Sequence, residues 1–263
     1  MRTPSATSNN GLPRPWGTTE APSRARVILL GACHGDPRGY RRTAEILQAL
    51  NPDVVAVEVS PFALWFRRHH RRFLMDRLRR SIAVASRRLG IPPAQAYGHP
   101  RVRRLFIQIA PPYEWRAARA HRAAFGTPCY PVDSSTFSRA LISHWPELLS
   151  PDNVTVLLSL PSDETPSADA EYRRAAWTLS MGRSLPFSPP ASHAAPLFEE
   201  REPHLETQVR AILRALKPAR LVYLGGWEHL LPGASSPSLA QRLRDLQPTR
   251  LLLDGTVAGA VDE

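Results

Sequence analysis

Short apolar runs that alternate with helical stretches constrain the fold of this 263-residue chain more than any other feature. The runs lie at residues 27–30, 54–59, 128–132, 221–224 and 251–253, and their length and apolar character predict buried β-strands. The stretches between them place apolar residues at helical spacing. This alternation is typical of an α/β fold, so we expect a mainly parallel central sheet flanked by helices.

The chain is expected to form one domain with a helical addition. Residues 1–25 are polar and contain several prolines, which predicts a disordered N-terminal tail. Residues 26–263 show no break suited to a linker, and we expect a single α/β domain there. Within it, residues 61–126 are helix-rich and arginine-rich and predict a helical cap or insertion. Residues 184–196 are rich in Ser and Pro and predict a loop, whereas residues 154–160 fit either a strand or a buried helix.

The basic excess is concentrated in one segment. The chain has 34 basic and 23 acidic residues, a formal net charge of +11, and Asp76 is the only acid within the arginine-rich residues 67–88. Apolar residues interleave with these arginines near helical spacing, and we favour a solvated helix that covers the sheet. Two functional alternatives stay open. The arginines steer an acidic substrate, or they contact nucleic acid or a membrane surface, which we favour less.

Targeting and redox features favour an intracellular location. The first 17 residues lack the apolar core of a signal peptide, and no run of 18 apolar residues could span a membrane. We therefore expect a cytoplasmic protein without a transmembrane segment. Its two cysteines, Cys33 and Cys129, are then reduced, and they are too few for a disulfide scaffold.

Four predicted strands end at ionisable residues. His34 follows the first strand, Glu58 closes the second, Asp133 follows the third, and His229 comes after the run at 221–224. In open α/β sheets the C-terminal edge of the strands holds the ligand crevice. Glu58 is the most constrained, because a buried carboxylate needs a cation, a metal or hydrogen-bond donors. We expect these side chains to converge.

A second group of polar residues precedes the helix predicted at 203–216. Glu199, Glu200 and Glu202 surround Arg201 there. Acidic residues are also favoured at helix N-termini by the helix dipole, which is a purely structural alternative for this cluster.

These residues together resemble a known superfamily. The motifs Gly31-x-x-His34, Asn51-Pro52-Asp53-Val54-Val55-Ala56-Val57-Glu58, Glu200-Arg201-Glu202 and Gly226-x-x-His229 occur in that order. They resemble the superfamily that joins erythromycin esterases, ChaN-type haem-binding lipoproteins, TIKI metalloproteases and TraB/PrgY proteins, and the TIKI/TraB branch most closely. The resemblance implies metal-dependent hydrolysis of a peptide or a similar acyl bond.

The resemblance also implies roles for individual residues. His34, Glu58, Glu200 and His229 would be metal ligands or acid–base groups, and Arg201 would orient a carboxylate or stabilise an oxyanion. These ligand types suit Zn, Mn, Co or Fe alike, so only a divalent ion is implied. Haem is a less favoured alternative.

The sequence departs from the superfamily pattern in one motif. Glu202 stands where Asp or Asn is usual after Glu-Arg, and Pro203 fixes a helix start directly behind it. Which of Glu199, Glu200 and Glu202 acts therefore stays open. The secondary site candidates are Asp133, Glu202 and Glu228.

Three functions are compatible with these observations. The first is a metal-dependent hydrolase, or an enzyme of related acyl chemistry, that acts on a peptide-like or acidic substrate. The second is a metal-free hydrolase of the erythromycin-esterase type, in which His34 is the general base and Glu58 orients it. The third is a non-catalytic protein, either a haem or metal binder or an arginine-rich regulator.

Overall fold

A six-stranded sheet forms the centre of the molecule. The computed structural model describes residues 26–161, 167–182, 200–232 and 236–258, so the predicted tail at 1–25 and loop at 184–196 lie outside the described residues. The strand order is β3-β2-β4-β1-β5-β6. The parallel strands are β1 (Arg26–Ala32), β2 (Val54–Val57), β3 (Cys129–Pro131), β4 (Arg220–Gly226) and β5 (Thr249–Leu252). The short β6 (Val257–Ala258) is antiparallel to β5, so the predicted α/β fold with a mainly parallel sheet is confirmed.

The central strands explain the unbroken apolar runs. β1 pairs with β4 over seven residues, from Arg26 opposite Arg220 to Ala32 opposite Gly226. The residues of β1 and β4 beyond this first pair are buried. A strand that is covered on both faces needs apolar side chains at every position, because neither face meets water.

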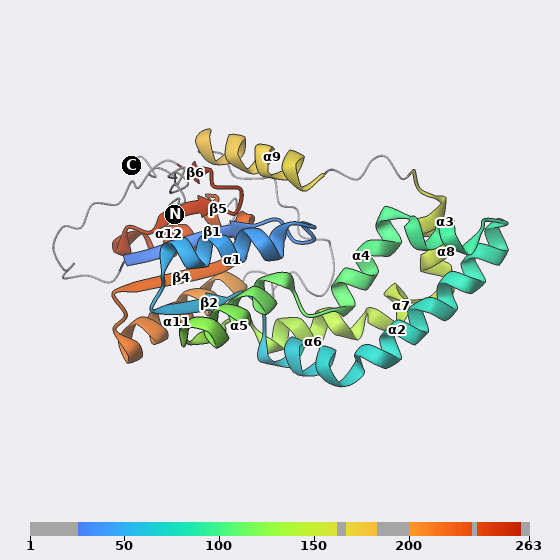
Figure 1. The fold of residues 1–263 in the computed structure, drawn as a ribbon, viewed down its shortest axis with the longest axis horizontal. Helices are drawn as coiled ribbons and strands as arrows, with labels where there is room; N and C mark the ends of the chain where they lie inside the picture. Colours follow the sequence, from blue (N-terminus) through green and yellow to red (C-terminus); the bar gives the residue numbers. More distant parts are fainter. Residues whose placement is uncertain (1–25, 162–166, 183–199, 233–235, 259–263) are drawn as a thin grey trace, which may run out of the picture.

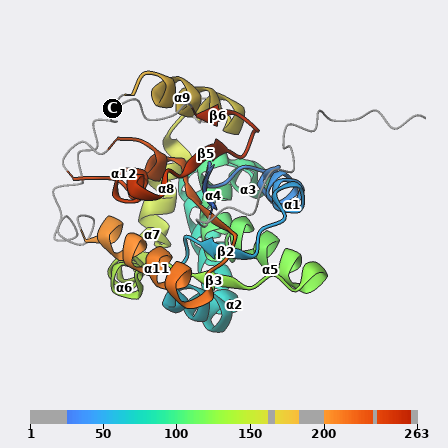
Figure 2. The ribbon, with the colours of Figure 1, turned by 90° about the vertical axis from the view of Figure 1, so that its left-hand side faces the viewer.

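Helices cover both faces of the sheet (Figures 1 and 2). On one face α1 (Gly39–Leu50) packs against α5 (Tyr113–Phe125), and on the other lie α11 (Arg201–Leu216) and α12 (Leu239–Arg242). α9 (Ala168–Ser180) lies beside β6, and the 3₁₀ turns η1 (Trp227–Leu230) and η2 (Arg244–Leu246) follow β4 and α12. We call the sheet with these helices the sheet body. Gly39 permits the close packing of α1 on α5, because a Cβ there would overlap the ring of Tyr113.

The remaining helices project from the sheet body, and we call them the helical arm (Figure 1). They are α2 (Pro61–Leu89), α3 (Pro93–Gly98), α4 (Pro100–Ile109), α6 (Ser135–Ser143), α7 (Trp145–Leu148) and α8 (Pro151–Ser159). α2 starts at the cap residue Ser60, whose hydroxyl accepts the backbone N–H of Ala63 at 2.9 Å. It ends at Gly90, which adopts the left-handed conformation with φ 65°.

The helical arm begins at residue 61, and its helices are not the same set as the helix-rich residues 61–126. α5 packs on α1 and the sheet, whereas α6 and α8, which follow residue 126, pack on α2. Residues 154–160, which fit strand or helix, fall almost entirely within α8, and the buried Val154 and Leu158 are spaced one helical turn apart. In the described part of the chain, no helix has the length and apolar character needed to cross a membrane.

Candidate active site

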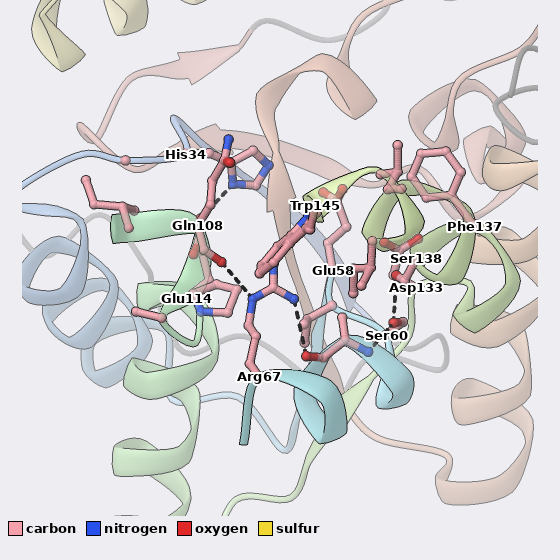
Figure 3. A pocket seen from close by; sticks show the side chains of 18 of the residues that line it. His34, Glu58, Ser60, Arg67, Gln108, Glu114, Asp133, Phe137, Ser138 and Trp145 are labelled. Atoms are coloured by element: carbon pink, nitrogen blue, oxygen red, sulfur yellow. Dashed lines mark hydrogen bonds and ion pairs between the residues drawn. The ribbon is translucent and has the colours of Figure 1, made fainter. Parts of the chain in front are cut away.

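His34 lies just beyond the end of β1 and contacts a carboxylate of α5 (Figure 3). Its Nδ1 is 2.9 Å from Oε1 of Glu114. The Glu114 side chain is only 5% exposed, whereas that of His34 is 58% exposed. Although burial opposes it, the hydrogen bond and the charge of Glu114 raise the pKa of His34 to about 9. A buried carboxylate therefore holds an imidazole that opens toward solvent.

The backbone that precedes His34 is fixed by two tyrosines. The hydroxyl of Tyr113 donates a hydrogen bond to the carbonyl of Cys33 at 3.0 Å. The backbone N–H of Cys33 donates to the hydroxyl oxygen of Tyr172 at 3.2 Å. Both tyrosines are buried, so the turn after β1 is anchored from α5 and from α9. Since Tyr113 adjoins Glu114, the same turn of α5 positions both the backbone and the ring of His34.

Glu58 follows β2 and is almost fully buried, with 3% of its side chain exposed. Its Oε1 pairs with the guanidinium of Arg201 and lies 3.1 Å from Nε2 of His229. Its Oε2 accepts the backbone N–H of Gly226 at 2.5 Å. Although burial raises it, the charges of His229 and Arg201 hold the pKa of Glu58 well below its usual range. Glu58 is therefore an ionised carboxylate whose partners come from three other elements, α11, η1 and β4.

Arg201, the first residue of α11, joins the ends of two neighbouring strands. Its Nε is 3.0 Å from Oδ1 of Asp133, and its Nη2 is 2.9 Å from Oδ2 of the same carboxylate. This is the two-point geometry in which a guanidinium recognises a carboxylate most strongly. Because Nη2 also reaches Glu58, one cation neutralises charge after β2 and after β3.

His229 lies in η1 with both ring nitrogens facing carboxylates. Nδ1 is 2.5 Å from Oε1 of Glu202, and Nε2 faces Glu58. Although burial lowers it, the charges of Glu58 and Glu202 raise the pKa of His229 to about 10, so the ring is an imidazolium near neutral pH. These contacts join all the groups into one assembly, which we call the buried charge cluster: Glu58, Asp133, Arg201, Glu202 and His229.

Two glycines bring the end of β4 close to this cluster. A Cβ on Gly225 would overlap the carboxylate of Glu58. A Cβ on Gly226 would lie 2.7 Å from Oε2 of Glu228, 3.2 Å from Nε2 of His34 and 3.6 Å from Oε2 of Glu58. These three polar atoms therefore surround the backbone of Gly226, with His34 and Glu228 on the side open to solvent.

The structure places the sequence-predicted residues in three groups. The buried charge cluster unites five of them, and His34 and Glu228 adjoin it at Gly226. Glu200 differs, because it caps α11 and is exposed to solvent. Glu199 lies outside the described residues. Of the two described glutamates beside Arg201, Glu202 is the one that contacts a histidine.

Glu114 is the site residue that sequence reasoning misses. It lies 80 positions from His34 and takes the orienting contact that we expected of Glu58. One signal in the sequence could have found it, because Glu114 is the only acid between Asp76 and Asp133 in a strongly basic region. Glutamate is almost never fully buried unless it is paired, and Glu114 is paired with His34.

The expected metal ligands do not form a metal site in this arrangement. The described residues hold no group of three or more His, Cys, Asp or Glu side chains that could bind an ion together. His229 commits both nitrogens to carboxylates, whereas a ligating histidine keeps one nitrogen for the metal. Glu58 faces the cation Arg201, and Glu200 is exposed. A divalent ion and haem stay predictions from the resemblance.

A pocket of about 580 Å³ opens between the strand ends and the helical arm (Figure 3). At one end it is lined by the polar residues His34, Glu58, Glu114, Asp133 and Arg201. The arm lines the other end with mainly apolar side chains, among them Ile107, Phe137, Leu141, Ile142, Trp145 and Leu148. The polar residues of the arm that also line the pocket are Arg67, Gln108, Ser138 and His144. The Nε of Arg67 donates to the carbonyl of Gln108 at 2.9 Å, and its guanidinium lies 5.3 Å from the Trp145 ring centre.

No family model, curated protein or solved structure matches this chain. The superfamily resemblance therefore stays a prediction from four short motifs. The pocket, the His34–Glu114 pair and the buried charge cluster stand on their own geometry, and any functional conclusion has to be drawn from them.

Proposed function

We propose that the protein is a hydrolase that cleaves an ester or a related acyl bond, with His34 as its general base. The observation that carries the proposal is the His34–Glu114 pair at the polar end of the pocket. In the neutral tautomer whose Nδ1–H donates a hydrogen bond to Glu114, Nε2 holds a free lone pair that can accept a proton from water. The role fits the second of the three functions compatible with the sequence.

The reaction requires one proton to move twice. Nε2 of His34 takes a proton from water while the water oxygen attacks the acyl carbon. The resulting imidazolium is stabilised by the buried carboxylate of Glu114, to which Nδ1–H stays bonded. The carbon–oxygen bond to the leaving group then breaks, and His34 returns the proton to the leaving alkoxide. The products are a carboxylic acid and an alcohol, and His34 is neutral again.

The pocket lining favours a substrate with an apolar body and an anionic group. The arm supplies apolar side chains over one end of the cavity. Arg201 shares its charge between Glu58 and Asp133, whereas the contacts of Arg67 within the described structure are two carbonyl oxygens and the ring of Trp145. Arg67 therefore offers a cation to the substrate, and this agrees with the acidic substrate expected from the basic composition.

Hydrolysis of a graded series of esters tests the proposal. Purified protein is assayed with p-nitrophenyl esters from acetyl to dodecanoyl, and we expect turnover to rise with chain length until the apolar end of the pocket is filled. His34→Gln should lower kcat/KM by about 10²–10⁴-fold, the usual range for a general base. The matched control is His204→Gln, which changes a histidine of α11 outside the pocket.

Removal of metal separates the two hydrolase alternatives. We expect turnover to survive dialysis against a chelator, because His34 activates water without an ion. Loss of turnover that added Zn or Mn restores would contradict this mechanism and favour the metal-dependent one. Full turnover in His34→Gln would contradict the role of His34 in either.

A further inference from the structure

The helical arm carries nearly all the net charge of the molecule. Its residues 61–109 and 135–159 contain 13 arginines and three acids, whereas the rest of the chain contains 21 basic and 20 acidic residues. A general preference for arginine would raise the charge of both parts. The excess is instead confined to the projecting helical arm, whose acids are Asp76, Glu147 and Asp152. This distribution indicates a surface that meets a polyanion.

The arginines of α2 face solvent with few acidic partners. Among the described residues, the ion pairs of α2 are Arg79 with Asp76 at 3.0 Å and Arg88 with Asp152 at 2.5 Å. By helical periodicity the exposed Arg68, Arg72, Arg80 and Arg87 share the solvent face with Trp65, and the paired Asp76 and Arg79 lie on the same face.

Aromatic side chains stand among these arginines. Trp65 and Phe73 are 51% and 57% exposed, although large apolar side chains are normally buried. They lie eight residues apart on α2 with His69 between them, and the ring centres of Trp65 and His69 are 4.9 Å apart. Rings exposed within a basic surface are the platforms on which the bases of single-stranded nucleic acids stack.

A membrane fits this surface less well than a nucleic acid does. Insertion into a lipid interface needs a continuous apolar helix face. The apolar face of α2, formed by Leu74, Leu78 and Ile82, is already buried where α2 packs on α6 and α8. What remains exposed is a basic face with separate rings, and a nucleic acid supplies both phosphates for the charges and bases for the rings.

We propose that the exposed face of α2 binds single-stranded RNA or DNA. Phosphates contact Arg68, Arg72 and Arg80, and bases stack on Trp65 and Phe73. The surface is separate from the hydrolytic pocket, which α2 lines with Ala63 and Arg67 instead. The binding therefore does not depend on the proposed hydrolase.

Fluorescence anisotropy with labelled oligo(U) and oligo(dT) tests the proposal on the full chain. We expect the affinity to fall steeply with salt, and the triple variant Arg68→Gln/Arg72→Gln/Arg80→Gln to reduce the slope of log K against log salt by about 2, at roughly 0.7 per phosphate contact. Trp65→Ala/Phe73→Ala should weaken binding about fivefold or more per ring while the slope stays the same. The comparison of the two oligonucleotides distinguishes RNA from DNA.

Matched variants decide the outcome. Arg41→Gln/Arg173→Gln/Arg214→Gln removes the same charge from exposed positions of the sheet body and should leave binding intact. His34→Gln should also bind like the wild type. Equal losses of affinity in the two arginine triple variants would overturn the proposal. So would an affinity for heparin that equals the affinity for the oligonucleotides and does not change in Trp65→Ala/Phe73→Ala. Binding to phosphatidylserine vesicles without oligonucleotide binding would assign the face to a membrane instead.

Discussion

The sheet body and the helical arm treat charge in opposite ways. In the body, the buried charge cluster pairs each carboxylate with Arg201 or His229 at a defined distance. In the arm, arginines such as Arg68 and Arg72 stand in water. A buried charge without a partner costs several kcal/mol, whereas an exposed one costs almost nothing. The position of each charge in the body is therefore fixed by its partner. In the arm the charges are solvated, and their sum sets the electrostatic potential of the surface.

Removal of Arg201 should have the largest effect, and it tests the body half of this contrast. Arg201→Met leaves Asp133 buried without its cation and Glu58 with His229 alone, so the free energy of unfolding should fall by about 3–5 kcal/mol. Urea unfolding measures the change. The matched control is Arg72→Met on the exposed face of α2, which should change stability by less than about 0.5 kcal/mol. Similar losses in both variants would break the contrast.

The pH dependence of stability gives the next largest effect. The pKa of His229 is about 10 in the folded protein, because the carboxylates of Glu58 and Glu202 face the ring. In the unfolded chain it is about 6.5. Arg201, which pairs with Glu58, and Tyr223 also lie near the ring. This raised pKa contributes stability that is fully present below about pH 6.5 and is lost as the pH rises through 10. This contribution of His229 should fall by up to about 1.4 kcal/mol per pH unit in this window.

Substitution of His229 isolates that contribution. Urea unfolding of His229→Gln at several pH values should give a flatter dependence between neutral pH and pH 10 than the wild type gives. The remaining slope reports His34, whose pKa is also raised. An unchanged slope in His229→Gln would show that the ring is not an imidazolium in the folded protein.

Substitution of Glu114 tests the site at the boundary between the two regions. Glu114 belongs to α5 of the body, and it lines the pocket together with residues of the arm. Glu114→Gln should lower kcat/KM by about 10²-fold, the lower end of the range for general acid–base catalysis, because the general base itself is kept. In the wild type the rate should rise with pH up to about 9, since His34 acts as a base only after losing its proton. In the variant this rise should move to lower pH, although Glu58 and Glu228 still face His34. A pH–rate profile that does not move would contradict the orienting role.

The smallest effect is expected in the arm. The triple variant Arg68→Gln/Arg72→Gln/Arg80→Gln should keep the free energy of unfolding within about 0.5 kcal/mol per site, because these side chains are exposed. Relief of repulsion between like charges should offset part of any loss. Thermal unfolding measures the change, and a large drop in Tm would show that the arm charges are structural.

The strand ends are predictable from the sequence, and the cross-chain partners are not. His34, Glu58 and His229 stand where continuous apolar runs stop, and such runs are a local consequence of burial on both faces. Glu114 lies in a helix, and its contact with His34 depends on how α5 packs against the sheet. Residues 154–160 show the same limit, because the packing of α8 on α2 decides between helix and strand there.

The position of β4 between β1 and β2 has a consequence for biosynthesis. Among the described strands β1 leaves the ribosome first, yet its sheet neighbours are β4 and β5, near residues 220 and 250. Contacts this distant in sequence form slowly, and an apolar strand without a partner is prone to aggregation until they form. His34 and His229 therefore come together only after most of the chain has been made. A nascent chain that stops before β4 has neither a complete sheet nor the candidate active site.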